Sequence, residues 1–145
     1  MAEKVTLKVQ KIEKDARLPS YAYADDAGLD VCSIEDVVIP PGQVRAIRIG
    51  LKICIPPTHF CLMKGKTGLA INHQLHTISE VYDPNYRGEF SVILLNSGHR
   101  PYRVRKFQKI AQIVILERPE VVIEEVGELD STERGEKHFG SSGLD

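Results

Sequence analysis

The sequence lacks any long apolar run. Among its 145 residues, no stretch approaches the roughly 20 consecutive apolar residues that a membrane-spanning helix needs. The N-terminal residues lead directly into the alternating Val5, Leu7 and Val9, with no apolar signal-peptide core and no small-residue cleavage site. We therefore expect a protein that crosses no membrane and acts inside the cell, in the cytoplasm, the nucleus or both.

Paired cysteines and an excess charge of one sign are also missing. The cysteines are three, none in a C-x-x-C pair: Cys32, Cys54 and Cys61. This pattern indicates neither a disulfide framework nor a thiolate metal site. Nineteen basic against twenty acidic residues leave a formal charge of −1, which favours neither nucleic acid nor anionic lipid as a partner. An anion bound by this chain must be held by a local site.

The chain has the length of one domain and a pattern typical of β-strands. Apolar and polar residues alternate with period two in residues 5–9, 44–49 and 52–55, which predicts half-buried strands. Residues 92–95 and 110–116 are apolar almost throughout, which predicts central strands buried on both faces. Proline and glycine interrupt these stretches often. We expect an all-β fold, a jelly-roll-like barrel or sandwich, with one or two helical turns near residues 69–74.

The C-terminal part has a different composition. It turns acidic from Glu117, and after Asp130 it is small, charged and rich in glycine and serine. Such a segment cannot bury enough apolar surface to order itself. We predict a β domain over residues 1–130 and a flexible arm over residues 131–145.

Two segments near the middle of the chain suit phosphate chemistry, although each also has a plain structural interpretation. Lys66, Thr67 and Gly68 offer a cation, a hydroxyl and backbone amides, but Phe60 stands where a P-loop needs glycine. Asp83 and Pro84 open a type I turn, in which Asp83 could merely act as a cap.

Three further segments are equally ambiguous when taken alone. Asp30 is separated by one residue from Gly28 at the start of a β stretch, where a simple turn would suffice. Gln112 is a lone polar residue in an apolar strand, and a core hydrogen bond would satisfy it. Arg134 and Phe139 lie in the mobile tail together with two serines, as a closing lid requires, but a plain disordered tail is the alternative.

In their order and spacing, these five segments resemble the five motifs of the trimeric dUTPase family. They are AGLD (27–30), GKTGLA (65–70), VYDPNYRGE (81–89), KIAQI (109–113) and RGEKHFGSSG (134–143). The resemblance implies a jelly-roll-like β-clip fold and a homotrimer with shared active sites. The first, second and fourth motifs would come from one chain, the third from a neighbour, and the fifth from the arm of the remaining chain.

The resemblance also implies an activity and a role for each residue. The enzyme would hydrolyse dUTP to dUMP and pyrophosphate by attack of water on the α-phosphorus, which limits uracil incorporation into DNA. Asp83 would be the base that activates water, and Tyr86 would lie under the deoxyribose and exclude a 2′-hydroxyl. The backbone near Val81 and Tyr82 would bind the uracil edge, and cytosine would leave buried groups unpaired there.

The remaining roles concern the phosphates and the metal. The implied phosphate-binding residues are Lys66, Thr67, Gly68, Gln112, Arg134, Gly140, Ser141 and Ser142, with Phe139 stacked on the uracil. Mg²⁺ would be held mainly by the triphosphate, and Asp30 would touch it only through water.

The sequence departs from the family pattern in the hairpin before Asp83. Glu80 stands where glycine is usual, Tyr82 replaces a small aliphatic residue, and no glycine lies between Ala70 and Asp83. Because glycine permits close approach to the base, these changes put uracil selectivity in question. Lys66 and Thr67 replace the usual Arg-Ser, which exchanges a bidentate fork for a point charge.

Three alternatives stay open. A dCTP deaminase of the wider superfamily would need a carboxylate against the cytosine, for which Glu80 is the only candidate. A catalytically weak, regulatory nucleotide-binding trimer would explain the altered hairpin but not the retained Asp83 and Tyr86. A nucleic-acid strip could use Arg100, Arg103, Arg105, Lys106 and Lys109, although a solvated strand face is the simpler interpretation.

Overall fold

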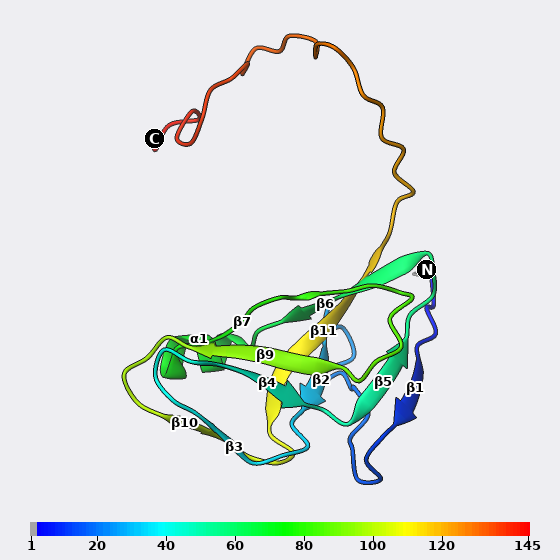
Figure 1. Ribbon diagram of the computed structural model, residues 1–145, viewed down its shortest axis with the longest axis vertical. Coiled ribbons are helices and arrows are strands. Elements are labelled where there is room, and N and C mark those ends of the chain that lie inside the picture. The colour runs from blue at the N-terminus through cyan, green and yellow to red at the C-terminus, as the bar shows by residue number, and fades with distance from the viewer. Residues whose placement is uncertain (1–2) are drawn as a thin grey trace.

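The structure is a computed structural model that describes residues 3–145, and it consists mainly of short β-strands (Figure 1). The strands are β1 (Lys8–Lys11), β2 (Leu29–Cys32), β3 (Val37–Ile39), β4 (Val44–Arg48), β5 (Leu51–Cys54), β6 (His59–Lys64), β7 (Leu75–Thr77), β8 (Val81–Tyr82), β9 (Ser91–Asn96), β10 (Tyr102–Val104) and β11 (Lys109–Glu117). A short helix, α1 (Thr67–His73), follows β6. The prediction of an all-β, jelly-roll-like fold is confirmed.

Most predicted elements form close to their expected places. The stretches 44–49 and 52–55 become β4 and β5, while the first strand begins at Lys8, later than the alternation predicts. The helix begins at Thr67, slightly before the predicted turns. It ends where Gln74 adopts a left-handed conformation with φ 51°.

The strands pair in an antiparallel manner into four groups. The largest has the order β2-β11-β6-β8, and a second has the order β4-β9-β7. The pairs β1-β5 and β10-β3 complete the body. In the largest sheet, Gln112 of β11 lies opposite Asp30 of β2 on one side and opposite Lys64 of β6 on the other. The pairing therefore brings the first, second and fourth motifs together on neighbouring strands.

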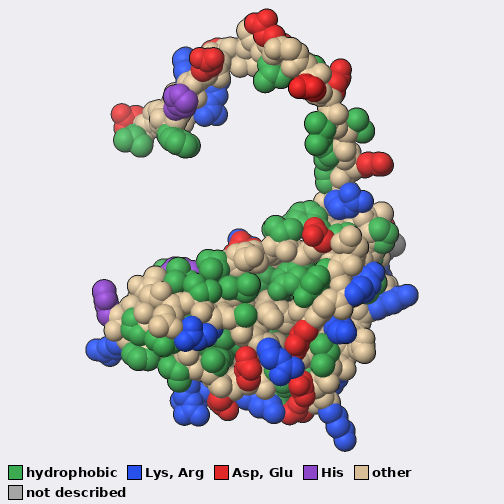
Figure 2. Space-filling view, in the orientation of Figure 1, with side chains coloured by type: hydrophobic (Ala, Val, Ile, Leu, Met, Phe, Trp, Pro, Cys, Tyr) green, Lys and Arg blue, Asp and Glu red, His purple; other side chains and the backbone are tan. Residues whose placement is uncertain are grey.

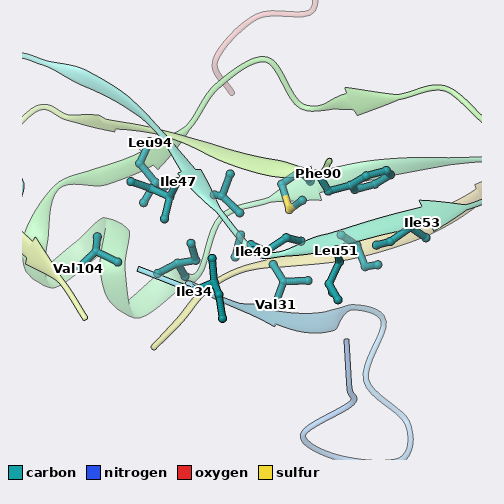
Figure 3. Packing of buried hydrophobic residues seen from close by; sticks show 14 of the residues in the cluster. Val31, Ile34, Ile47, Ile49, Leu51, Ile53, Phe90, Leu94 and Val104 are labelled. Carbon is teal, nitrogen blue, oxygen red and sulfur yellow. The ribbon is translucent and has the colours of Figure 1, made fainter. Parts of the chain in front are cut away.

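One apolar core fills the space between the sheets (Figure 3). It contains fully buried side chains from many strands and from the loop before β9, among them Ile39, Ile47, Phe90, Ile110 and Ile113. The alternation of buried and less buried residues along β6 and β9 reflects the two faces of each strand. Each large buried side chain contributes about 1.5–3 kcal/mol to stability, so the core holds the strand register that positions the polar side chains.

The prediction that residues 92–95 and 110–116 are buried on both faces is wrong for the single chain. Both stretches do form central strands, since β9 lies between β4 and β7, and β11 between β2 and β6. In β9, however, Ile93 and Leu95 are only half-buried, and Leu116 at the end of β11 is exposed. An apolar run predicts a central strand, but it does not show that the same chain covers both faces.

Beyond β11 the chain leaves the body. Arg118 is still attached, because its backbone N–H donates to the Thr58 carbonyl at 2.8 Å. Residues 119–145 have no helix or strand and are exposed throughout. Figures 1 and 2 show this segment as an arch that stands away from the β body.

No helix within residues 3–145 is both long enough and apolar enough to cross a bilayer. The three cysteines carry free thiols, and burial raises the pKa of the Cys61 thiol to about 12. The Cys61 thiol therefore stays protonated and unreactive at neutral pH.

Candidate active site

The first polar cluster surrounds Asp30 at the edge of the largest sheet. Lys66 Nζ donates to Asp30 Oδ1 at 2.5 Å, and Lys109 Nζ lies 3.2 Å from Asp30 Oδ2. The Asp30 side chain is 5% exposed, whereas both lysines reach solvent. Burial raises the pKa of the Asp30 carboxyl, but the two ion pairs outweigh it and hold the pKa below its usual value of 3.8. Asp30 is therefore ionised at neutral pH.

Gln112 lies beside Asp30 and faces the loop that precedes α1. Its Nε2 donates to the carbonyl of Gly65 at 3.0 Å, so this polar side chain is satisfied within the chain. A Cβ atom on Gly28 would lie 2.2 Å from Gln112 Oε1, so a larger residue at that position would displace the Gln112 side chain. We call Asp30, Lys66, Lys109 and Gln112 the Asp30 cluster. Thr67 and Gly68 open α1 next to it and are exposed.

The second polar region is the turn that carries Asp83. The Tyr86 backbone N–H donates to the Asp83 carbonyl at 3.2 Å, and Arg87 Nη1 donates to the Pro84 carbonyl at 2.7 Å. The predicted turn is therefore present. No hydrogen bond or ion pair within residues 3–145 involves the Asp83 carboxylate, which is exposed. A groove of about 770 Å³, bordered by Asp83, Arg87 and Pro56, leaves room beside it.

Three aromatic rings pack together at the Asp83 turn. Tyr82 stacks on Phe90 with ring centroids 4.1 Å apart, and Tyr86 lies at a tilt to both rings at 5.7 Å. Tyr82 Oη donates to the Ser91 carbonyl at 2.5 Å, and burial raises the pKa of the Tyr82 hydroxyl above its usual 10.0. The Tyr82 side chain is thus engaged in the body, while its neighbour Val81 is 63% exposed.

Gly88 leaves room for the Tyr86 ring. A Cβ atom on Gly88 would lie 2.3 Å from Tyr86 Oη, so a larger residue there would displace the ring. Tyr86 Oη donates to the Glu89 carbonyl at 3.0 Å, and the ring remains 40% exposed. The turn therefore presents an aromatic surface beside a carboxylate that has no partner.

The structure does not bring all the predicted site residues together. Within the described part of the chain, no hydrogen bond or ion pair connects the Asp30 cluster to the Asp83 turn. The arm residues lie apart from both, and Phe139 is fully exposed. The arm bends locally, since Arg134 Nε donates to the Lys137 carbonyl at 3.3 Å. Arg134, Gly140, Ser141 and Ser142 are exposed as well.

The pairing of Lys109 with Asp30 is not predicted from the sequence, in which Lys109 opens the fourth motif and is one of the five basic residues of a possible nucleic-acid strip. In the structure, three of the five are paired with acids: Arg103 with Asp36 at 3.7 Å, Lys106 with Asp15 at 2.7 Å, and Lys109 with Asp30. Much of the positive charge on this face is therefore compensated. Lys109 comes near Asp30 through the pairing of β11 with β2, and the local sequence pattern does not reveal the register of that pairing.

The chain matches one protein family along nearly its whole length. A sequence model of the dUTPase family matches residues 14–143. The chain belongs to the dUTPase family. The deoxyuridine 5′-triphosphate nucleotidohydrolase of Gloeothece citriformis is 44% identical over 140 residues, which cover 95% of this chain and 97% of that protein. The protein of the same description from Clostridioides difficile is 41% identical over 140 residues, or 95% and 98% of the two chains.

Solved dUTPase structures have the same fold. The structure of Staphylococcus bacteriophage 80alpha dUTPase with dUPNHPP superposes with a TM-score of 0.89 at 28% identity and covers 96% of this chain and 99% of that one. The dUTPase of phage phi11 gives a TM-score of 0.81 at 22% identity, over 88% and 99% of the two chains, which supports the fold alone. These comparisons confirm the resemblance that the five motifs predict.

Proposed function

We propose that this dUTPase-family chain hydrolyses dUTP to dUMP and pyrophosphate inside the cell, in the cytoplasm, the nucleus or both. The observation that carries the proposal is the Asp83 carboxylate, exposed beside a groove and without a partner within residues 3–145. Next to it lies the Tyr86 ring, for which Gly88 leaves room because it has no side chain. A general base needs such access to water, whereas a carboxylate that merely capped its turn would accept backbone hydrogen bonds.

In the proposed reaction, Asp83 takes a proton from a water molecule whose oxygen attacks the α-phosphorus. A bond forms between that oxygen and the α-phosphorus, and the bond from the α-phosphorus to the bridging oxygen of the β-phosphate breaks. Pyrophosphate leaves, and dUMP retains the water oxygen. Positioning and charge stabilisation supply most of the rate in phosphoryl transfer, so the remaining residues serve to hold the substrate.

The Asp83 turn would also select the nucleoside. The exposed ring of Tyr86 would offer a flat surface for the deoxyribose and would exclude a 2′-hydroxyl. The backbone of Val81 and Tyr82 would bind the uracil edge. The Tyr82 side chain would hold this backbone in place, because it stacks on Phe90 and donates to the Ser91 carbonyl. Because the large Tyr82 ring is packed into the body, it does not occupy the surface where a base would lie.

The Asp30 cluster would hold the phosphates. Lys66 supplies the cation, Thr67 and Gly68 supply a hydroxyl and backbone amides, and Gln112 supplies an amide. Lys66 is paired with Asp30 in this structure, so it would exchange part of that contact for phosphate oxygens on binding. From the arm, Arg134 would bind the γ-phosphate, Phe139 would stack on the uracil, and Gly140, Ser141 and Ser142 would close over the phosphates.

The residues present fit a magnesium ion that the substrate itself brings. Within residues 3–145, no group of three or more His, Cys, Asp or Glu side chains could hold a metal ion without help. Asp30 is buried and ionised, and each of its oxygens keeps a free lone pair beside its lysine partner, which suits contact through water. When bound, Mg²⁺ would neutralise charge that develops on the triphosphate.

We further propose that the site is shared among the chains of a homotrimer. The Asp30 cluster, the Asp83 turn and the arm have no polar contact with one another in the described chain, although the chemistry needs all three. A neighbouring chain could place its Asp83 turn against the Asp30 cluster, and the arm over residues 131–145 could reach a third chain. The half-buried apolar residues of β9 are available for contact between chains.

The proposal is tested by measuring pyrophosphate release from dUTP, dCTP, dTTP and UTP in parallel, with Mg²⁺ and then with EDTA. We expect release from dUTP alone and its loss in EDTA. Ammonia release from dCTP would instead indicate a deaminase. Absence of release from every nucleotide, with retained binding of a dUTP analogue, would favour the regulatory alternative and contradict the proposed activity.

A further inference from the structure

Glu80 lies where the chain crosses from one sheet to another. β7 pairs with β9 in the three-stranded sheet, and β8 pairs with β6 in the four-stranded sheet. The three residues between them, 78–80, make this crossing, and the Ile78 N–H donates to the Ile93 carbonyl at 3.0 Å. The same residues lead directly into Val81 and Tyr82, whose backbone is proposed to bind the base.

The Glu80 side chain links the two sheets. Thr77 Oγ1, at the end of β7, donates to Glu80 Oε1 at 2.6 Å, and Lys64 Nζ, at the end of β6, donates to Glu80 Oε2 at 2.6 Å. The Met63 N–H also donates to the Glu80 carbonyl at 2.8 Å. Each carboxylate oxygen therefore has its own donor, one from each sheet. We call Glu80, Lys64 and Thr77 the Glu80 clasp.

The crossing needs such support because its backbone is strained. Ser79 has φ 57°, in the left-handed region that glycine adopts freely and other residues rarely do. No glycine is available between Ala70 and Asp83 to relieve this strain. Hydrogen bonds from Lys64 and then Thr77 hold the pKa of Glu80 below its usual 4.5, so the clasp stays charged at neutral pH.

We propose that Glu80 is a positioning residue for base recognition, which holds the crossing in the shape that Val81 and Tyr82 need to bind uracil. This inference rests on the proposed dUTP hydrolysis. The Glu80 carboxylate is directed to Lys64 and Thr77, so we assign its side chain to the support of the crossing and not to a direct contact with the base. The clasp thus supports a hairpin in which the family usually has glycine. It also gives Glu80 a role other than deamination.

The test compares Glu80→Ala and Lys64→Met with the wild-type chain. For each variant we expect the KM for dUTP to rise about two- to fivefold with kcat changed less than about twofold, because a partly exposed ion pair has a modest effect. Preference for dUTP over dCTP should fall by a similar factor. Since both residues act through one contact, the double variant should lose no more than the stronger single variant.

Two further measurements separate this role from a general loss of stability. Amide hydrogen exchange of residues 78–82 should become faster in Glu80→Ala, while the core strand β9 keeps its wild-type protection. The matched control is Lys106→Met, which breaks the 2.7 Å ion pair with Asp15 at a distant surface and should leave KM, selectivity and exchange at residues 78–82 unchanged.

The outcomes distinguish the two proposals. An active wild-type enzyme whose Glu80→Ala variant keeps its KM, its selectivity and its slow exchange would overturn the role of the clasp. A wild-type chain that releases no pyrophosphate from dUTP would overturn the proposed function and the role in base recognition together. In that case, fast exchange in Glu80→Ala would show that the clasp only shapes the crossing.

Discussion

The Asp30 cluster and the Asp83 turn place their carboxylates in opposite environments. Asp30 is buried and ion-paired with two lysines, whereas the Asp83 side chain is exposed and its carboxylate makes no polar contact within residues 3–145. Both residues lie in short motifs with an Asp near a Gly or Pro, so the sequence alone does not separate them. The structure shows which carboxylate is ion-paired and which is exposed.

The difference matches the demands of the two proposed tasks. A group that orients cations and phosphates benefits from fixed partners, because ordered ion pairs lose less freedom when the substrate binds. A base must exchange its proton during turnover and must reach water. The contrast predicts that changes at Asp83 affect the rate, whereas changes at Asp30 affect stability and substrate affinity.

The largest effect should come from Asp83→Asn. The amide keeps the size of the side chain but cannot take the proton of water, so kcat should fall about 10²- to 10⁴-fold. Thermal unfolding should stay close to wild type because the carboxylate has no partner to lose. Near-normal turnover in this variant would remove Asp83 from the role of base.

Deleting the chain after Asp130 should have the next largest effect. The deletion removes Arg134 and Phe139 but leaves the β body, whose core contains none of residues 131–145. Loss of one or two charged hydrogen bonds lowers affinity about ten- to a hundredfold, so we expect kcat/KM for dUTP to fall by that amount. Unchanged kinetics in the truncated protein, with the assembly state checked by light scattering, would show that the arm is not a lid.

Gly88→Ala should disturb the Asp83 turn without touching the Asp30 cluster. The added Cβ would meet Tyr86 Oη at 2.3 Å, and relief of such overpacking costs about 1–3 kcal/mol. The shifted ring should raise the KM for dUTP and weaken the exclusion of UTP, as steady-state kinetics with both nucleotides would reveal. Gly127→Ala is the matched control, because nothing lies near its Cβ. Equal kinetics in the two variants would contradict the role of Tyr86.

The smallest effect concerns acid stability. The pKa of Asp30 is lowered in the folded chain, so its contribution to stability is present above the usual value of 3.8 and is lost as pH falls through the lower folded value. Asp30→Asn removes this contribution, and its melting temperature should depend less steeply on pH below about 4. Scanning calorimetry from pH 3 to 6 checks this, and parallel curves for both proteins would contradict it.

Much of the fold and part of the site could be predicted from the sequence. Period-two alternation gave the places of β4 and β5, and the Asp-Pro pair gave the Asp83 turn, because both depend on neighbouring residues. The contacts of Lys109 and Glu80 depend on how distant strands pair, and local sequence patterns do not reveal that pairing. The half-buried face of β9 was missed because an apolar side chain looks the same in sequence whether its own chain or another covers it.

In the proposed trimer, the Asp30 cluster and the Asp83 turn of different chains form one site. To test this arrangement, two variants are co-refolded in equal amounts: Asp83→Asn, which lacks the proposed base, and Lys66→Met, which lacks the proposed phosphate-binding cation. Each variant alone should be poorly active. In randomly mixed trimers, a site that combines an intact Asp83 from one chain with an intact Lys66 from another should form about a quarter of the time. We therefore predict recovery of about a quarter of wild-type kcat per site. Activity no greater than the average of the two separate variants would contradict the shared site.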